Sequence, residues 1–149
     1  MTRRPPKTAE EIMTRRVYTL SPEASVVDAA QTLLRLGYSG APVTDEHGNV
    51  LGIFSEQDSL RVLTQAAYEG WPSGTVADHM TSEVDSVAPG DDLPAVSTHL
   101  SDGKHRRVLV IDDGRLLGVI SRRDLIRALE RVLAPSRPPT IYEIFNRPR

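Results

Sequence analysis

Two serine–aspartate pairs are the side chains of this sequence best suited to chemistry. Ser55 precedes Asp58 in the stretch GIFSEQDSL, and Ser121 precedes Asp124 in the stretch GVISRRDLI. If a helix begins after each serine, the hydroxyl and the free backbone N–H groups form an anion site that the helix dipole favours. The aspartate, one turn into the helix, can accept charge-assisted hydrogen bonds from two hydroxyl groups. The same spacing is also a capping box, and capping alone explains both pairs without a ligand.

Familiar motifs for catalysis or metal binding are absent from the sequence. It contains no GxGxxG, GxxxxGKS/T, HExxH or GxSxG pattern, and its four histidines are scattered without metal-ligand spacing. It has no cysteine, which excludes disulfides and thiolate chemistry. We therefore predict that the protein is not an enzyme, holds no metal and requires no cofactor.

Both pairs belong to a longer internal repeat. The segment from Thr8 to Thr14 recurs as the segment from Thr75 to Thr81, each with a threonine at its start and a Met-Thr pair at its end. Two copies are too few for a solenoid, and they predict two units packed about a pseudo-twofold axis. Sites are then expected in pairs.

The elements that must position these residues follow from hydrophobic periodicity and from turn residues. Short helical turns are expected where Thr8 and Thr75 open possible capping boxes with Glu11 and Asp78. Each copy then reads strand, helix, strand, strand, helix, which predicts a mixed α/β fold of the α+β type whose two units pack through their sheets. The expected strands are 17–20, 41–44, 50–54, 84–87, 108–111 and 116–120, and the expected longer helices are 26–34, 93–100 and those that begin near Ser55 and Ser121.

The repeat also predicts the domain organisation. We assign residues 8–70 to the first unit, 75–133 to the second and 134–149 to a C-terminal tail. With 149 residues, 39% of them apolar, each unit alone is marginal in burial, so the two are expected to share a core.

Composition limits the partners and the compartment. The formal net charge of −2 argues against nucleic-acid binding. The longest apolar run, 108–111, is far too short to span a bilayer, and the N-terminus has no apolar signal core. We therefore predict a soluble cytoplasmic protein that contacts neither membrane nor nucleic acid.

The tandem Gly-hydrophobe-x-Ser-x-x-Asp signature, the Met-Thr openings and the segment GYSGAPVTD (37–45) resemble the cystathionine β-synthase (CBS) domain family over residues 8 to about 133. Two copies of such a domain form a Bateman module. The resemblance implies that clefts between the repeats bind AMP, ADP, ATP or a related adenosyl ligand, and that the bound state regulates an unidentified partner protein. The alternative is a ligand-independent docking module whose serine–aspartate motifs only cap helices.

The resemblance also implies the residues of two sites. The aspartates would bind the ribose, the serines the phosphate, and the threonines and methionines of the opening turns would flank the base. One cleft would combine Thr8, Met13, Tyr38 and Ser39 with Ser121 and Asp124, and would have Arg122 and Arg123 inside its motif. The other would combine Thr75, Met80, His105 and Arg106 with Ser55 and Asp58. Two alternatives remain: the methionines are core residues, and the arginines are solvated or pair with Asp112 and Asp113.

The same resemblance implies a homodimer formed by the helices that follow the two aspartates. These helices carry more apolar side chains than packing on one sheet requires, and an isologous interface is the commonest way to cover such a surplus. The side chains are Leu60, Val62, Leu63 and Ala67 in the first helix, and Leu125, Ile126, Leu129, Val132 and Leu133 in the second.

Overall fold

The computed structural model describes residues 4–102, 105–136, 138, 141 and 145. Its elements are α1 (Ala9–Ile12), α2 (Val26–Leu36), β1 (Ala41–Thr44), β2 (Val50–Phe54), α3 (Glu56–Tyr68), α4 (Val76–His79), β3 (Ser86–Val87), α5 (Leu93–Ser101), β4 (Arg107–Asp112), β5 (Arg115–Ser121) and α6 (Arg122–Leu133). They form a mixed α/β fold with two small sheets, as the repeat predicts. The proposed tail, 134–149, lies largely outside the described residues.

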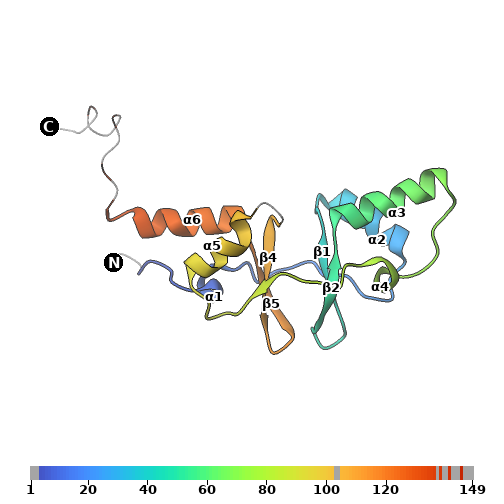
Figure 1. Ribbon diagram of the computed structural model, residues 1–149, viewed down its shortest axis with the longest axis horizontal. Coiled ribbons are helices and arrows are strands. Elements are labelled where there is room, and N and C mark those ends of the chain that lie inside the picture. Colours follow the sequence, from blue (N-terminus) through green and yellow to red (C-terminus); the bar gives the residue numbers. More distant parts are fainter. Residues whose placement is uncertain (1–3, 103–104, 137, 139–140, 142–144, 146–149) are drawn as a thin grey trace.

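The chain forms two lobes that lie side by side along its long axis (Figure 1). The first lobe holds the antiparallel hairpin β1–β2 with α2, α3 and α4. The second lobe holds the sheet β3–β4–β5 with α5, α6 and α1, in which β3 runs parallel to β4 and β4 antiparallel to β5. Each lobe therefore contains one copy of the predicted hairpin and its flanking helices, around its own hydrophobic core. The core shared by both units that the length suggested is therefore wrong.

Each lobe also contains the opening helix of the other repeat. Ala9 and Met13, from the start of the chain, pack in the core of the second lobe, and the Ala9 N–H donates to Asp91 O at 2.8 Å. Val76, from the start of the second repeat, is fully buried in the core of the first lobe, and the Val76 N–H donates to Ala24 O at 2.9 Å. A four-residue helix has no stable fold of its own and needs a neighbouring core to bury its apolar side. The two repeats are thus joined by a reciprocal exchange of helices.

The segments that follow the exchanged helices pair with the central strands of the other repeat. Thr14 exchanges two backbone hydrogen bonds with Val119 of β5, at 2.9 and 3.0 Å. Thr81 makes the equivalent pair with Ile53 of β2, at 2.8 Å in both directions. The hairpin tips add a third connection, because Val50 donates to Gly114 O at 2.9 Å. The lobes are therefore held together by backbone pairing of hairpins and crossing segments.

Most local predictions agree with the structure. The helix predicted from 26 ends at Leu36, and Gly37 follows it in the left-handed region with φ +74°. Pro94 lies in the first turn of α5, where a missing N–H costs nothing. The strand predicted at 17–20 is the exception. It is reduced to a single parallel bridge between Leu20 and Val43, and its counterpart β3 has only two residues.

Candidate functional site

A cleft of about 700 Å³ lies where the two lobes meet. Side chains from both lobes and from both crossing segments line it, so neither repeat forms it alone. Half of the residues predicted for the two sites are in its lining, namely Tyr38, Ser39, Ser55, His105, Arg106, Ser121 and Asp124. The structure therefore brings the two predicted clefts together as two halves of one space.

The half around Ser121 starts at the N-terminus of α6. The Ser121 hydroxyl accepts the Asp124 N–H at 3.1 Å, and the Asp124 carboxylate accepts the Ser121 N–H at 3.0 Å through Oδ2. This is the predicted capping box. Asp124 nevertheless lines the cleft, and within the described part of the chain no group donates to its Oδ1. The carboxylate can accept further hydrogen bonds while the cap stays intact.

The half around Ser55 has the same capping box, but its aspartate is enclosed. Asp58 is only 2% exposed, and it is absent from the cleft lining. Its Oδ2 accepts the Ser55 N–H at 2.8 Å, the Ser55 hydroxyl at 2.8 Å and the Thr81 hydroxyl at 3.3 Å, while Oδ1 lies 3.4 Å from Arg61 Nη1. Asp58 therefore ties α3 to the crossing segment, which agrees with the capping alternative.

The structure groups the remaining cleft residues differently from the prediction. A Cβ on Gly40 would lie 3.2 Å from Ser55 Cα, so the neighbouring Tyr38 and Ser39 belong with Ser55 rather than with Ser121. In the second lobe the Arg122 N–H donates to Arg106 O at 3.2 Å. His105 and Arg106 therefore belong with Ser121. The residues before each hairpin lie beside the serine of the same repeat because the two strands of a hairpin pair with each other. β1 pairs with β2, which leads to Ser55, and β4 pairs with β5, which leads to Ser121.

The threonines and methionines predicted to flank the base are absent from the cleft lining. Met13 is 9% exposed within the core of the second lobe, and Met80 packs against the core of the first, as the core alternative states. Thr8 and Thr75 begin the exchanged helices and are also absent from the cleft lining. The N–H and then the hydroxyl of Thr75 donate to Asp78, and these bonds hold the pKa of that carboxyl below its ordinary value.

The two arginines of the second motif also lie outside the cleft lining. Arg122 Nε donates to Leu100 O at 2.9 Å, so its guanidinium closes the C-terminal end of α5. Arg123 is exposed. Neither forms an ion pair with Asp112 or Asp113 among the described residues. A structural role of Arg122, rather than ligand contact, follows from its bond to α5.

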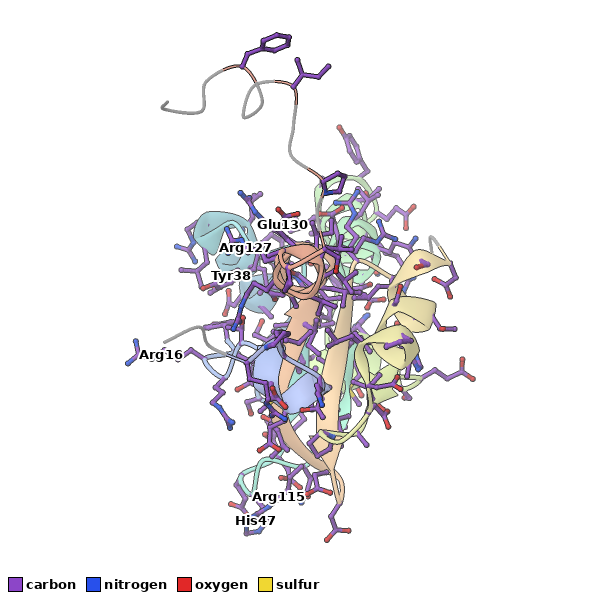
Figure 2. The ribbon with its side chains drawn as sticks, turned by 90° about the vertical axis from the view of Figure 1, so that its left-hand side faces the viewer. Arg16, Tyr38, His47, Arg115, Arg127 and Glu130 are labelled. Carbon is purple, nitrogen blue, oxygen red and sulfur yellow. The ribbon has the colours of Figure 1, made fainter. Side chains whose placement is uncertain are left out.

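Sequence reasoning missed the crossing segments as part of the site. Both extended segments contribute side chains to the cleft lining. The first contributes Thr14, Arg16, Val17 and Tyr18, and the second contributes Thr81, Glu83 and Asp85, which alternate with the period of an extended chain. The sequence feature that could have indicated these segments is the Met-Thr pair. In each copy the threonine lines the cleft and the methionine packs in or against a core. Tyr18 stacks on Tyr38 with ring centroids 5.7 Å apart, and Figure 2 shows Tyr38 on the same side of the molecule as Arg16.

Two repeated α/β units that exchange helices and share a ligand-sized cleft define a tandem-repeat module. The family model of the CBS domain matches residues 9–64 and, a second time, residues 76–131. The chain therefore belongs to the CBS domain family, as a tandem pair, and the resemblance noted from the sequence is confirmed.

Curated relatives and solved structures agree with this family. An uncharacterized protein of Methanocaldococcus jannaschii is 30% identical over 119 residues, which cover 80% of this chain and 41% of that protein. An A-adding tRNA nucleotidyltransferase of Geobacter sulfurreducens is 32% identical over 124 residues, covering 83% of this chain but only 13% of the enzyme. The chain thus spans less than half of the length of either relative.

Among solved structures, the protein CBSX2 in complex with AMP is 29% identical, with a TM-score of 0.71 over 87% of this chain and 98% of that chain. The CBS-domain containing protein ATU1752 from Agrobacterium tumefaciens is 28% identical, with a TM-score of 0.67 over 83% of this chain and 93% of that chain. Both similarities extend over nearly the whole of the compared structures.

Two further findings concern membranes and metals. None of the described helices has the length and apolar character needed to cross a bilayer. The described residues also include no group of three or more histidine, aspartate or glutamate side chains arranged to hold a metal ion.

Proposed function

We propose that this protein is a regulatory module that binds an adenine nucleotide, or a related adenosyl ligand, in the cleft between its two CBS repeats. The observation that carries the proposal is the Ser121–Asp124 helix start, which opens into the cleft with a carboxylate oxygen still available. The hydroxyl and backbone N–H groups of a helix start suit a phosphate, and a carboxylate suits the two hydroxyls of a ribose. The AMP bound to the similar protein CBSX2 supports this choice of ligand.

The way the cleft is built supports a regulatory role. Its walls come from both lobes and from the crossing segments, so a ligand that contacts both lobes favours one relative arrangement of them. A ligand shifts such an equilibrium by its difference in affinity for the two arrangements. We propose that an effector protein recognises the shifted arrangement, and that the module itself catalyses no reaction.

Nucleotide binding is expected at micromolar affinity, which corresponds to roughly 8 kcal/mol. We expect AMP at a hundredfold excess over its Kd to stabilise the folded protein by about 2.7 kcal/mol and to raise its melting temperature by several degrees. The measurement is a thermal melt with AMP, ADP, ATP, NAD or S-adenosylmethionine, followed by calorimetry of each ligand that shifts it. Inorganic phosphate at the same concentration is the control for nonspecific anion effects.

The second candidate function is ligand-independent docking. Its support is that both serine–aspartate motifs are complete capping boxes and that Asp58 is fully engaged inside the fold. In this case none of the five compounds changes the melting temperature or gives heat. That result would contradict nucleotide sensing and favour the docking module.

A homodimer remains part of the proposal. In the structure Val62 and Leu125 are buried, so the surplus apolar surface is smaller than the sequence suggests. Of the large side chains predicted for it, Leu60, Ile126, Val132 and Leu133 are exposed on α3 and α6, and Tyr68 at the end of α3 is exposed beside them in sequence. These two helices lie on the same side of the molecule, opposite the hairpin turns (Figure 1).

We expect light scattering to give twice the mass of the chain. Ile126→Glu should reduce this to the monomer mass, because a charge at a 66% exposed apolar position cannot be desolvated in an interface. Leu51→Glu, on the exposed part of β2, is the matched control and should remain dimeric. A monomer mass for the unmodified chain well above micromolar concentration contradicts the dimer.

A further inference from the structure

The two crossing segments bring opposite charges into the cleft. Arg16 lies two residues after Thr14, and Glu83 lies two residues after Thr81, so the two side chains occupy equivalent places in the repeat. Both line the cleft. Thr14 pairs with Val119 near Ser121 and Tyr18 stacks on Tyr38 beside Ser55, so Arg16 lies where its segment crosses between the two halves. Glu83 likewise lies between Thr81, which pairs with Ile53, and Asp85, whose O accepts the Leu109 N–H.

The hairpins and helix starts extend this difference in charge. The Ser121 half has Arg106 and Arg107 in the cleft lining, where the equivalent residues of the Ser55 half are Ser39 and Gly40. The Ser55 half instead has Glu56, the first residue of α3, in the lining. The Ser121 half thus has two arginines beside Asp85 and Asp124, whereas the described lining of the Ser55 half has Glu56 and no cation.

These charges are not neutralised by neighbours. Among the described residues, no ion pair joins Arg16, Arg106 or Arg107 to a carboxylate, and none joins Glu56 or Glu83 to a cation. The other two carboxylates of the lining have different settings. Asp85 is held by His99 at 2.5 Å, and Asp124 accepts the backbone N–H of its own helix cap.

We propose that the cleft selects the position of its ligand by charge, taking one phosphorylated nucleotide per chain with the phosphate in the Ser121 half. Arg106 and Arg107 supply guanidinium groups that suit phosphate oxygens, while Asp124 is available for the ribose. Glu56 disfavours phosphate in the Ser55 half, because like charges in a confined cleft repel each other. This inference rests on the proposed function, and it adds which residues set the stoichiometry.

The test is calorimetry with two probes that differ only in the phosphate, AMP and adenosine. The unmodified protein should bind one AMP per chain. Arg106→Glu should weaken AMP binding at least tenfold and change adenosine binding less than threefold. Glu56→Arg should bind a second AMP per chain. Glu46→Arg, with the same change of charge in the exposed β1–β2 turn, should behave as the unmodified protein.

Each contrary outcome has a distinct meaning. Two equivalent AMP sites in the unmodified protein, or no second AMP in Glu56→Arg, would overturn the charge selection and leave nucleotide sensing intact. Equal weakening of AMP and adenosine by Arg106→Glu would also overturn it, since the loss would not depend on the phosphate. If neither AMP nor adenosine binds the unmodified protein, the proposed function itself fails.

Discussion

Replacing Gly118 by alanine is expected to destabilise the protein by about 3 kcal/mol, since overpacking a core typically costs 1–3 kcal/mol and the clash involves backbone. An added Cβ would lie 2.7 Å from Thr14 O and 2.8 Å from Met13 Sδ. Thr14 O cannot move away freely, because it accepts the Val119 N–H at 3.0 Å in the pairing that holds the crossing segment. Urea unfolding followed by circular dichroism measures the loss.

Alanine substitutions at Gly52 and Gly90 provide a parallel test and a control for Gly118→Ala. Gly52→Ala should have an effect similar to that of Gly118→Ala, because its Cβ would lie 2.6 Å from Thr81 O. Gly90→Ala is the matched control. A Cβ there meets nothing within 4 Å and the φ is not in the left-handed region, so the change should stay within about 0.5 kcal/mol. If Gly118→Ala were as stable as Gly90→Ala, the crossing segment would not lie against β5 as described.

Alanine in place of Asp58 and of Asp124 is expected to give opposite results in stability and in binding. Asp58→Ala should lower the free energy of unfolding by about 3 kcal/mol, since it removes a helix cap and the buried charged acceptor of the Ser55 and Thr81 hydroxyls. Asp124→Ala removes only the cap of α6, at about 1 kcal/mol. It should weaken AMP binding by roughly tenfold to a hundredfold, as expected for hydrogen bonds to a charged group. Urea unfolding and calorimetry measure the two quantities.

The 2′-deoxy form of AMP provides the control for the role of Asp124. The unmodified protein should bind it more weakly than AMP, and Asp124→Ala should bind the two nucleotides equally. If the unmodified protein does not distinguish them, Asp124 does not bind the ribose and serves only as a cap. If Asp58→Ala weakens AMP binding as much as Asp124→Ala does, without loss of stability, then Asp58 is accessible to the ligand and its enclosure is not maintained in solution.

The helices and strands were largely predictable because their signals are local. The capping boxes at Ser55 and Ser121 form as the spacing indicates, and Gly37 ends α2 in the left-handed conformation. The hairpins follow from apolar runs separated by turn residues. The two copies of one pattern also predicted two similar units, and the resemblance to the CBS family implied a site built from both. The family is confirmed by the match to both repeats.

Only the tertiary structure decided where the short opening helices pack and which side chains share a half of the cleft. A four-residue helix carries no information about its partner in its own periodicity, because several apolar surfaces of the chain could bury it. Because each opening helix is buried in the opposite lobe, Thr14 and Thr81 lie at the cleft. The methionines before them, Met13 and Met80, pack in or against the cores. The same contacts separate two aspartates that are identical in local sequence pattern. Asp58 is enclosed because the crossing segment brings the Thr81 hydroxyl to it, whereas Asp124 remains in the cleft lining.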